Sequence, residues 1–312
     1  MHKYCNDPIK QFVPRANMTV NELVSEMGHA GAYNGGSLFQ AVEVYEVMLR
    51  DPAMTKFFAL AGAMVPAGMG GIVSTLMEKG HIDVLTSTGA NLTHDVIEAI
   101  GCHHYHGTAE CDDVDLRREE VNRIYDVLLP NEAFGDLEEF IQDVYCSLPE
   151  QPVTISCLLR TIGEQLESGI LATAAKHDIP VYCPAFQDSI LGLQYWLFSQ
   201  LHKKVILDAI GDMHVFLNMV YEVKKAGAVL VGGGVPKNFT LQSMLMTQNG
   251  FSSVIQLTGD RPDLGGLSGA TLDEAKSWGK IGEGGVGVTV YGDATITLPI
   301  LAVATLERLE QK

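Results

Sequence analysis

The sequence lacks several features that would place it in a common class of protein. Its six cysteines form no CxxC pair, so neither a disulfide framework nor a paired zinc motif is indicated. It contains no run of about 18 uncharged apolar residues, the length that a membrane-spanning helix needs. Residues 1–12 lack the apolar stretch of a signal peptide. We therefore expect a cytoplasmic protein without membrane contact and without a bound metal.

The chain is also short of positive charge. It has 21 lysines and arginines against 38 aspartates and glutamates, which gives a formal net charge of −17. A strongly acidic protein is poorly suited to nucleic acid, so we expect no DNA or RNA partner. The negative charge either attracts a cationic substrate or serves solubility, and composition does not choose between the two.

No GxGxxG string stands between a strand-like run and a helical pattern, which is the context of the dinucleotide-binding fingerprint. Short apolar runs nevertheless alternate with helical patterns along most of the chain. About seven runs are strand-like, at residues 56–64, 81–88, 179–186, 204–208, 228–231, 252–257 and 286–293. Strands that alternate with helices indicate a parallel sheet with helices on its faces. The sequence therefore predicts an α/β fold with a Rossmann-like, doubly wound, mostly parallel sheet.

The predicted organisation is an N-terminal arm and helix over residues 1–35, followed by a single domain over 36–312. Within that domain, the acidic residues 114–150 are predicted to be a helical insertion. Residues 154–177 have the apolar spacing of one long amphipathic helix.

Residues 101–113 interrupt the alternation with three histidines and two cysteines. Cys102 and His106 would align on a helix, but Gly101 and Gly107 disfavour a helix there. An ordinary loop or a partner contact is therefore favoured over a metal site.

A glycine triplet, Gly232–Gly234, follows the apolar run at residues 228–231. Three glycines after a strand either allow the backbone to approach a phosphate at the next helix N-terminus or form a packing turn. The pattern alone leaves both open.

The segment 265–280, GGLSGATLDEAKSWGK, places Glu274 and Trp278 on one helical face just before Lys280. A carboxylate and an aromatic ring both suit a cation, and a lysine beside them becomes a nucleophile when its amine is neutral. The alternative is a plain helix end, with Gly279 as the cap and Lys280 near the helix dipole.

The stretches SGATLDEAKSWGKI and VYGDATITLPIL resemble the C-terminal part of deoxyhypusine synthases, with Asp293 thirteen residues after Lys280. HIDVLTST, IPVYCPAFQDS and LVGGGVPKN agree in the same order, so the resemblance covers nearly the whole chain from about residue 10. The SWGK segment is specific to that family, whereas the glycine loops are not. The resemblance implies a Rossmann-like fold, a homotetramer with active sites between paired subunits, and NAD-dependent oxidation of a polyamine.

The resemblance also implies roles for individual residues. Lys280 would carry an aminobutyl group as an imine and pass it to a lysine of a translation factor or, in some relatives, to a free diamine. The substrate-binding residues would be Glu274, Trp278, Asn238, His94, Gly265 and Gly266. The NAD-binding residues would be Gly62, Ala63, Thr88, Gly89, Ala90, Asp188, Gly233, Thr258, Gly259, Asp293 and Ala294.

Several positions depart from the family pattern. Thr93 and His94 replace a pair of glutamates, Asn238 replaces a histidine, and Leu193 and Leu267 each replace an aspartate. Gly62 and Ala63 occupy the place of a Ser–Asn pair, so cofactor contacts there would come from the backbone. The substitutions indicate either an altered donor or acceptor, as in homospermidine synthesis, or changes compensated nearby. A non-catalytic NAD-binding protein of the same fold is the remaining alternative.

Overall fold

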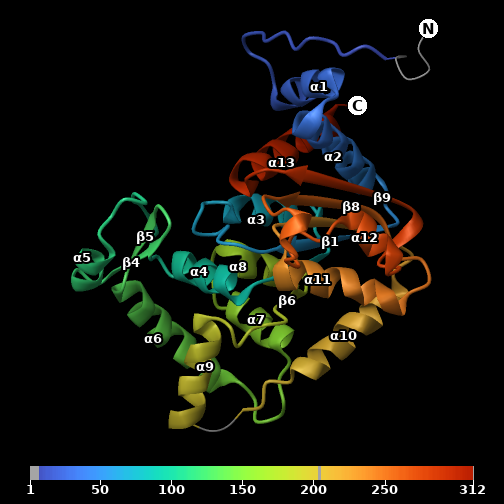
Figure 1. The fold of residues 1–312 in the computed structure, drawn as a ribbon. Coiled ribbons are helices and arrows are strands. Elements are labelled where there is room, and N and C mark those ends of the chain that lie inside the picture. Colours follow the sequence, from blue (N-terminus) through green and yellow to red (C-terminus); the bar gives the residue numbers. More distant parts are fainter. Residues whose placement is uncertain (1–6, 203–204, 312) are drawn as a thin grey trace.

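A computed structural model describes residues 7–202 and 205–311 and contains a central sheet of six parallel strands (Figure 1). Across the sheet the strands are β6 (Val181–Tyr182), β2 (Val84–Ser87), β1 (Met54–Leu60), β7 (Lys225–Val231), β8 (Phe251–Thr258) and β9 (Ile281–Tyr291). In chain order this is third, second, first, fourth, fifth, sixth, which is the strand order of the Rossmann fold. The predicted fold class is confirmed.

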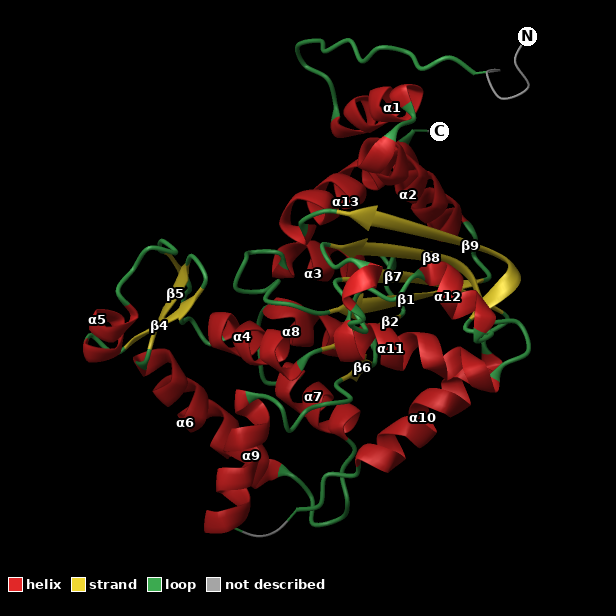
Figure 2. Ribbon diagram, viewed as in Figure 1, coloured by secondary structure: helices red, strands yellow, loops and turns green. Residues whose placement is uncertain are grey.

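Alternation along the strands supplies both faces of the sheet with a core. Phe57 packs with Phe216 and Phe251 on one face, whereas its neighbour Phe58 belongs to the larger core that includes Tyr45. Successive strand residues point to opposite faces, so a strand buried on both sides is apolar throughout. Helices therefore cover both faces, as the doubly wound arrangement requires (Figure 2).

The remaining elements complete the fold. Helices on the chain are α1 (Val20–Ala30), α2 (Tyr33–Arg50), α3 (Gly70–Glu78), α4 (Gly89–Ala99), α5 (Asp113–Arg118), α6 (Glu132–Ser147), α7 (Ile155–Gly163), α8 (Gly169–Lys176), α9 (Ile190–Leu201), α10 (Ala209–Glu222), α11 (Gly234–Ser243), α12 (Leu272–Ser277) and α13 (Ala294–Glu310). Two short 3₁₀ turns are η1 (Met244–Met246) and η2 (Pro262–Leu264). A small antiparallel sheet consists of β3 (Tyr105–His106), β5 (Val127–Pro130) and β4 (Val121–Ile124).

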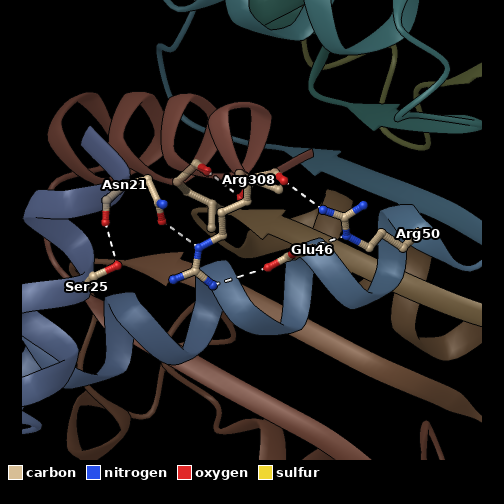
Figure 3. Close-up of polar contacts among 7 residues, drawn as sticks. Asn21, Ser25, Glu46, Arg50 and Arg308 are labelled. Atoms are coloured by element: carbon tan, nitrogen blue, oxygen red, sulfur yellow. Dashed lines mark hydrogen bonds and ion pairs between the residues drawn. The ribbon is translucent and has the colours of Figure 1, made fainter. Parts of the chain in front are cut away.

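The two N-terminal helices are joined to the C-terminal helix by a polar cluster (Figure 3). Arg308 of α13 donates to the Asn21 side chain at 2.6 Å and lies 3.3 Å from Glu46 of α2. Arg50 also pairs with Glu46, at 2.9 Å, and donates to the Arg308 carbonyl. The boundary predicted between residues 35 and 36 falls inside the first turn of α2. The division into arm and domain stays a prediction.

The predicted all-helical insertion over 114–150 was wrong for residues 121–130. There β4 and β5 pair as a hairpin, and β-branched residues such as Val121 and Ile124 suit paired strands. In Figure 1 this small sheet and α5 stand to one side of the central sheet. The helices at either end of the segment, α5 and α6, agree with the prediction.

The single long helix predicted over 154–177 was also wrong, because α7 ends at Gly163 and α8 begins at Gly169. Gly169 has a φ of 98°, and a Cβ at this position would lie 2.8 Å from a carboxylate oxygen of Asp95. That carboxylate accepts hydrogen bonds from the Ile170 and Leu171 amides. Asp95 of α4 therefore caps a new helix start that apolar spacing does not reveal.

The strand predicted at 204–208 is not formed over its described residues. Only an isolated bridge joins Leu207 to Val153, and Ile206 is exposed. Residue 204 lies outside the described residues. Within the described ranges, no helix has both the length and the apolar character needed to cross a membrane.

Candidate active site

A cavity of about 380 Å³ opens where the strand order of the sheet reverses, between β1 and β7. Ligands of open α/β sheets bind at this place, beyond the carboxyl ends of the strands. The lining residues are Ala61, Gly62, Ser87, Thr88, Gly89, Ala185, Asp188, Gly232, Gly233, Gly234, Val235, Pro236, Asp260 and Ser268. The first residues of α4 and α11 are among them, so two helix N-termini border the cavity and favour an anionic group there.

The predicted cofactor residues all lie at the carboxyl-end edge of the sheet, but only some line the cavity. Gly62, Thr88, Gly89, Asp188 and Gly233 do so. Ala63 and Ala90 directly follow lining residues in the chain. Thr258 ends β8 and Gly259 follows it, while Asp293 and Ala294 come after β9. The predicted cofactor residues therefore share one edge of the sheet, but only five of them line the cavity.

The aspartate after β9 already has a structural task. Asp293 is the N-cap of α13, and its Oδ1 accepts hydrogen bonds from the amide and hydroxyl of Thr295 at 2.7 and 2.9 Å. Its side chain is also exposed. The remaining carboxylate oxygen is the part of Asp293 left to meet a ligand.

The glycine triplet combines the two possibilities that the sequence left open. Gly233 packs directly against Ser268, leaving no room for a Cβ. Gly234, with a φ of 60°, begins α11 beside the cavity, and its amide donates to the Ser268 hydroxyl at 3.0 Å. The turn is therefore a packing contact with the 265–270 loop and a wall of the cavity at once.

Lys280 follows a helix end of the Schellman type. Trp278 is the C-cap of α12, Gly279 has a φ of 74°, and the Gly279 and Lys280 amides donate to the carbonyls of Lys276 and Ala275. The Lys280 ammonium donates to Asn238 Oδ1 of α11 at 3.2 Å and lies 5.8 Å from the centre of the Trp278 ring. The helix-end interpretation is thus correct for the backbone, while the side chain reaches α11.

The other predicted substrate residues are placed less closely. Glu274 is exposed on α12, and Gly265 and Gly266 lie in the exposed loop after η2. Trp278 is 63% exposed. His94 lies on α4, and its described hydrogen-bond partner is His104, not Lys280 or Asn238. The structure brings Lys280, Trp278 and Asn238 together, and leaves Glu274, Gly265 and Gly266 exposed to solvent.

His94 belongs to a chain of three side chains. Its Nδ1 lies 2.9 Å from Nε2 of His104, whose Nδ1 lies 2.6 Å from a carboxylate oxygen of Glu98. Burial, with a smaller contribution from the neighbouring His104 and against the opposing charge of Glu98, lowers the pKa of His94 to about 4. His94 is therefore neutral at pH 7 and takes part as a hydrogen-bonding group, not as a cation.

Sequence reasoning missed Lys237. This lysine of α11 is 3% exposed, and its ammonium donates to the carbonyl oxygens of Ala270, Ser268 and Leu267 at 2.6, 3.3 and 3.4 Å. Burial lowers its pKa to about 8, with the charge of Lys280 acting in the same direction. The sequence shows only that one lysine lies in the helix after the glycine triplet. Its burial depends on tertiary packing and cannot be predicted from composition.

A larger cleft, of about 1170 Å³, lies between α3, the turn before α8 and the small antiparallel sheet. It is bordered by several carboxylates, including Glu78, Glu98 and Glu164, and Lys280 is not among its lining residues. Over residues 7–202 and 205–311, no three histidine, cysteine or acidic side chains are grouped as metal ligands. Two of the histidines from the 101–113 loop contact Glu98 instead.

The sheet order and the cavity at its reversal define a Rossmann-like α/β protein with a candidate ligand site at the strand ends. The sequence model of the family described as deoxyhypusine synthase matches residues 22–305. A "Probable deoxyhypusine synthase 1" from Methanosarcina acetivorans is 54% identical, over 98% of this chain and 96% of its own length. A "Probable deoxyhypusine synthase" from Methanosarcina thermophila is 52% identical, over 99% and 98%. The chain belongs to the deoxyhypusine synthase family, whose members transfer aminobutyl groups and generally depend on NAD, and it is a transferase.

Solved structures support the fold. A crystal structure assigned to deoxyhypusine synthase from Entamoeba histolytica superposes with a TM-score of 0.64 at 15% identity, covering 93% of this chain and 94% of that one. The ternary complex of AgrE with ornithine and NAD⁺ superposes with a TM-score of 0.55 at 14% identity, covering 88% of this chain and 33% of AgrE. At these identities the likeness concerns the fold alone.

Proposed function

We propose that the protein is an NAD-dependent transferase that moves the aminobutyl group of a polyamine through Lys280 to an acceptor amine. The observation that carries the proposal is the position of the Lys280 ammonium, 3.2 Å from Asn238 on α11. The first turn of the same helix borders the cavity at the strand ends. A candidate nucleophile and a candidate cofactor site are thus linked by one helix.

The cavity residues fit a dinucleotide. Two helix N-termini suit a pyrophosphate, the glycines at 232–234 allow close backbone approach, and the carboxylates of Asp188 and Asp260 offer acceptors for ribose hydroxyls. AgrE, which shares the fold, has a structure with NAD⁺ and ornithine. When bound, NAD would supply the acceptance and return of a hydride.

Lys280 would then act as a nucleophile on the oxidised donor. Its neutral amine bonds to the imine carbon of the donor, the donor's leaving amine departs, and the aminobutyl group remains on Nζ as an imine. An acceptor amine later attacks the same carbon and releases Lys280 unchanged. Asn238 orients the amine through Oδ1, and the Trp278 face suits the remaining ammonium of the donor.

We propose a lysine of a translation factor as the acceptor, because the relatives that match nearly the full chain are named for deoxyhypusine synthesis. Leu193 and Leu267, where the resemblance expects acids, are both exposed, so the donor site of one chain offers little negative charge there. A homotetramer, with sites between paired subunits, belongs to the same proposal, and an exposed Trp278 is consistent with cover from a neighbour.

The test is to incubate the protein with NAD and spermidine, reduce with borohydride, and locate the added mass by peptide mass spectrometry. We expect an aminobutyl adduct on Lys280 that requires NAD and that disappears in Lys280→Ala, with a loss of turnover of roughly 10³-fold or more. Lys276→Ala is the matched control, since Lys276 lies on α12, four residues before Lys280, and pairs with Asp273.

Absence of any adduct with spermidine, putrescine or agmatine would overturn the proposal. A Lys280→Ala variant that retained every activity would instead support a non-catalytic NAD-binding protein. Labelled spermidine then identifies the acceptor: label on a translation factor supports deoxyhypusine synthesis, whereas homospermidine formed from added putrescine supports a free diamine.

A further inference from the structure

Two neighbouring residues of α11 hold opposite ends of the segment that carries the candidate nucleophile. Lys237 binds the carbonyls of residues 267, 268 and 270 before α12. Asn238, the next residue, accepts from the ammonium of Lys280 after α12. The segment 267–280 is therefore attached to a single helical turn at both of its ends.

Two further contacts fasten the first of these ends. Gln256 of β8 donates from Nε2 to the carbonyls of Gly232 and Ser268, at 3.0 and 2.9 Å. The Gly234 amide donates to the Ser268 hydroxyl at 3.0 Å. Ser268 is thereby tied to α11, to β8 and to the glycine turn that borders the cavity.

The choice of a lysine at position 237 follows from these acceptors. An ammonium has three N–H donors and no acceptor, so it can serve three carbonyls at once. The three acceptors found here are main-chain oxygens, and Glu274 and Asp260 act on it only as more distant charges. Burying a cation costs free energy unless its hydrogen bonds are satisfied. The three carbonyl oxygens satisfy the Lys237 ammonium, so the buried lysine is stable only while the loop that supplies them stays in place.

We infer that Lys237 is a positioning residue: it fixes the 267–280 segment so that Lys280 meets Asn238 of α11, the helix whose first turn borders the cavity. The attachment itself is independent of any activity. Its consequence for catalysis rests on the proposed function, in which a nucleophile must be held within a fraction of an ångström of its working position.

The attachment is tested by hydrogen–deuterium exchange of the variant Lys237→Met, which keeps most of the volume and removes the donors. We expect amides in 267–280 to exchange about 10-fold faster or more than in the wild type. The control is Lys56→Met, which removes a lysine paired with Asp83 at the opposite end of the sheet. Unchanged exchange over 267–280 in a folded Lys237→Met protein overturns the inference.

If Lys237→Met does not fold, Lys237→Gln gives the same readout, because its shorter amide side chain offers at most two N–H donors to the same three carbonyl oxygens. We expect faster exchange over 267–280 with a smaller amplitude. Equal exchange in a folded Lys237→Gln protein and the wild type overturns the inference in that case.

The consequence for catalysis is read from steady-state kinetics. For Lys237→Met we expect kcat to fall about 100-fold, with KM for the polyamine changed by no more than about 3-fold. A folded variant with wild-type kcat contradicts the positioning role. If the wild type itself forms no adduct on Lys280, the proposed function fails, while the exchange experiment still decides whether Lys237 holds the segment.

Discussion

The polar cluster that joins α1, α2 and α13 differs in kind from the cluster around Lys280. In the first, Arg308 and Arg50 both meet the carboxylate of Glu46 (Figure 3). In the second, Lys237 meets carbonyl oxygens and Lys280 meets an amide oxygen. One cluster pairs opposite charges, and the other holds two cations with neutral acceptors.

This difference indicates that the first cluster contributes to stability and the second to function. A carboxylate partner fixes a cation in its charged form, whereas neutral acceptors do so less strongly. Pairing opposite charges between α2 and α13, with the neutral Asn21 of α1 as a further acceptor, serves stability, since it attaches the C-terminal helix to the two N-terminal helices. Two neighbouring cations without a paired carboxylate do not stabilise a fold. Burial lowers the pKa of Lys237 to about 8, and perturbed groups of this kind gather at functional sites.

The largest expected effect on stability comes from breaking the first cluster. Arg308 is 12% exposed on its side chain, and Arg308→Met would leave Glu46 and Asn21 with fewer partners. We expect a loss of about 3 kcal/mol in the free energy of unfolding, with turnover of the folded enzyme unchanged. Denaturant titration measures the loss. Arg50→Met, at a more exposed pair, should cost less than about 1 kcal/mol; equal losses for both would contradict the comparison.

The next largest expected effect is a pH dependence of stability that comes from His94, which contacts Glu98 through His104. The pKa of His94 falls from 6.5 to about 4 on folding, so its contribution to stability is complete above pH 6.5 and is lost as pH falls towards 4. Between pH 7 and 5 we expect it to cost about 2 kcal/mol. Denaturant titrations at both values should show a smaller pH dependence for His94→Gln. An identical pH dependence in the variant would refute this account.

The smallest expected effect separates orientation from chemistry in the second cluster. Asn238→Ala removes the acceptor of the Lys280 amine, and we expect kcat to fall about 10-fold with little change in thermal stability. Asn238→His, which restores the residue that the family resemblance leads one to expect, should recover part of the rate. The borohydride adduct on Lys280 should form more slowly in the alanine variant; unchanged trapping kinetics would argue that Asn238 does not orient the amine.

Local pattern was enough for most of the sheet and failed where a contact from elsewhere intervened. The apolar runs before Gly62, Gly89 and Gly232 are strands because they are buried on both faces, which any sequence of their composition would suggest. The helix expected over 154–177 is divided because a carboxylate from α4 caps a second start at Gly169. Nothing in residues 154–177 themselves indicates that Asp95 caps a helix there.

The candidate site divides in the same way. Sequence alone determined the alternation of strands and helices, the capped helix end at Gly279 and, through the SWGK segment, the family to which the chain belongs. Tertiary structure decided that Lys280 meets Asn238, 42 residues earlier in the chain, and that Lys237 is buried. The physical reason is that α11 follows β7 and α12 precedes β9, so they meet across β8 only because of the order in which the strands pair.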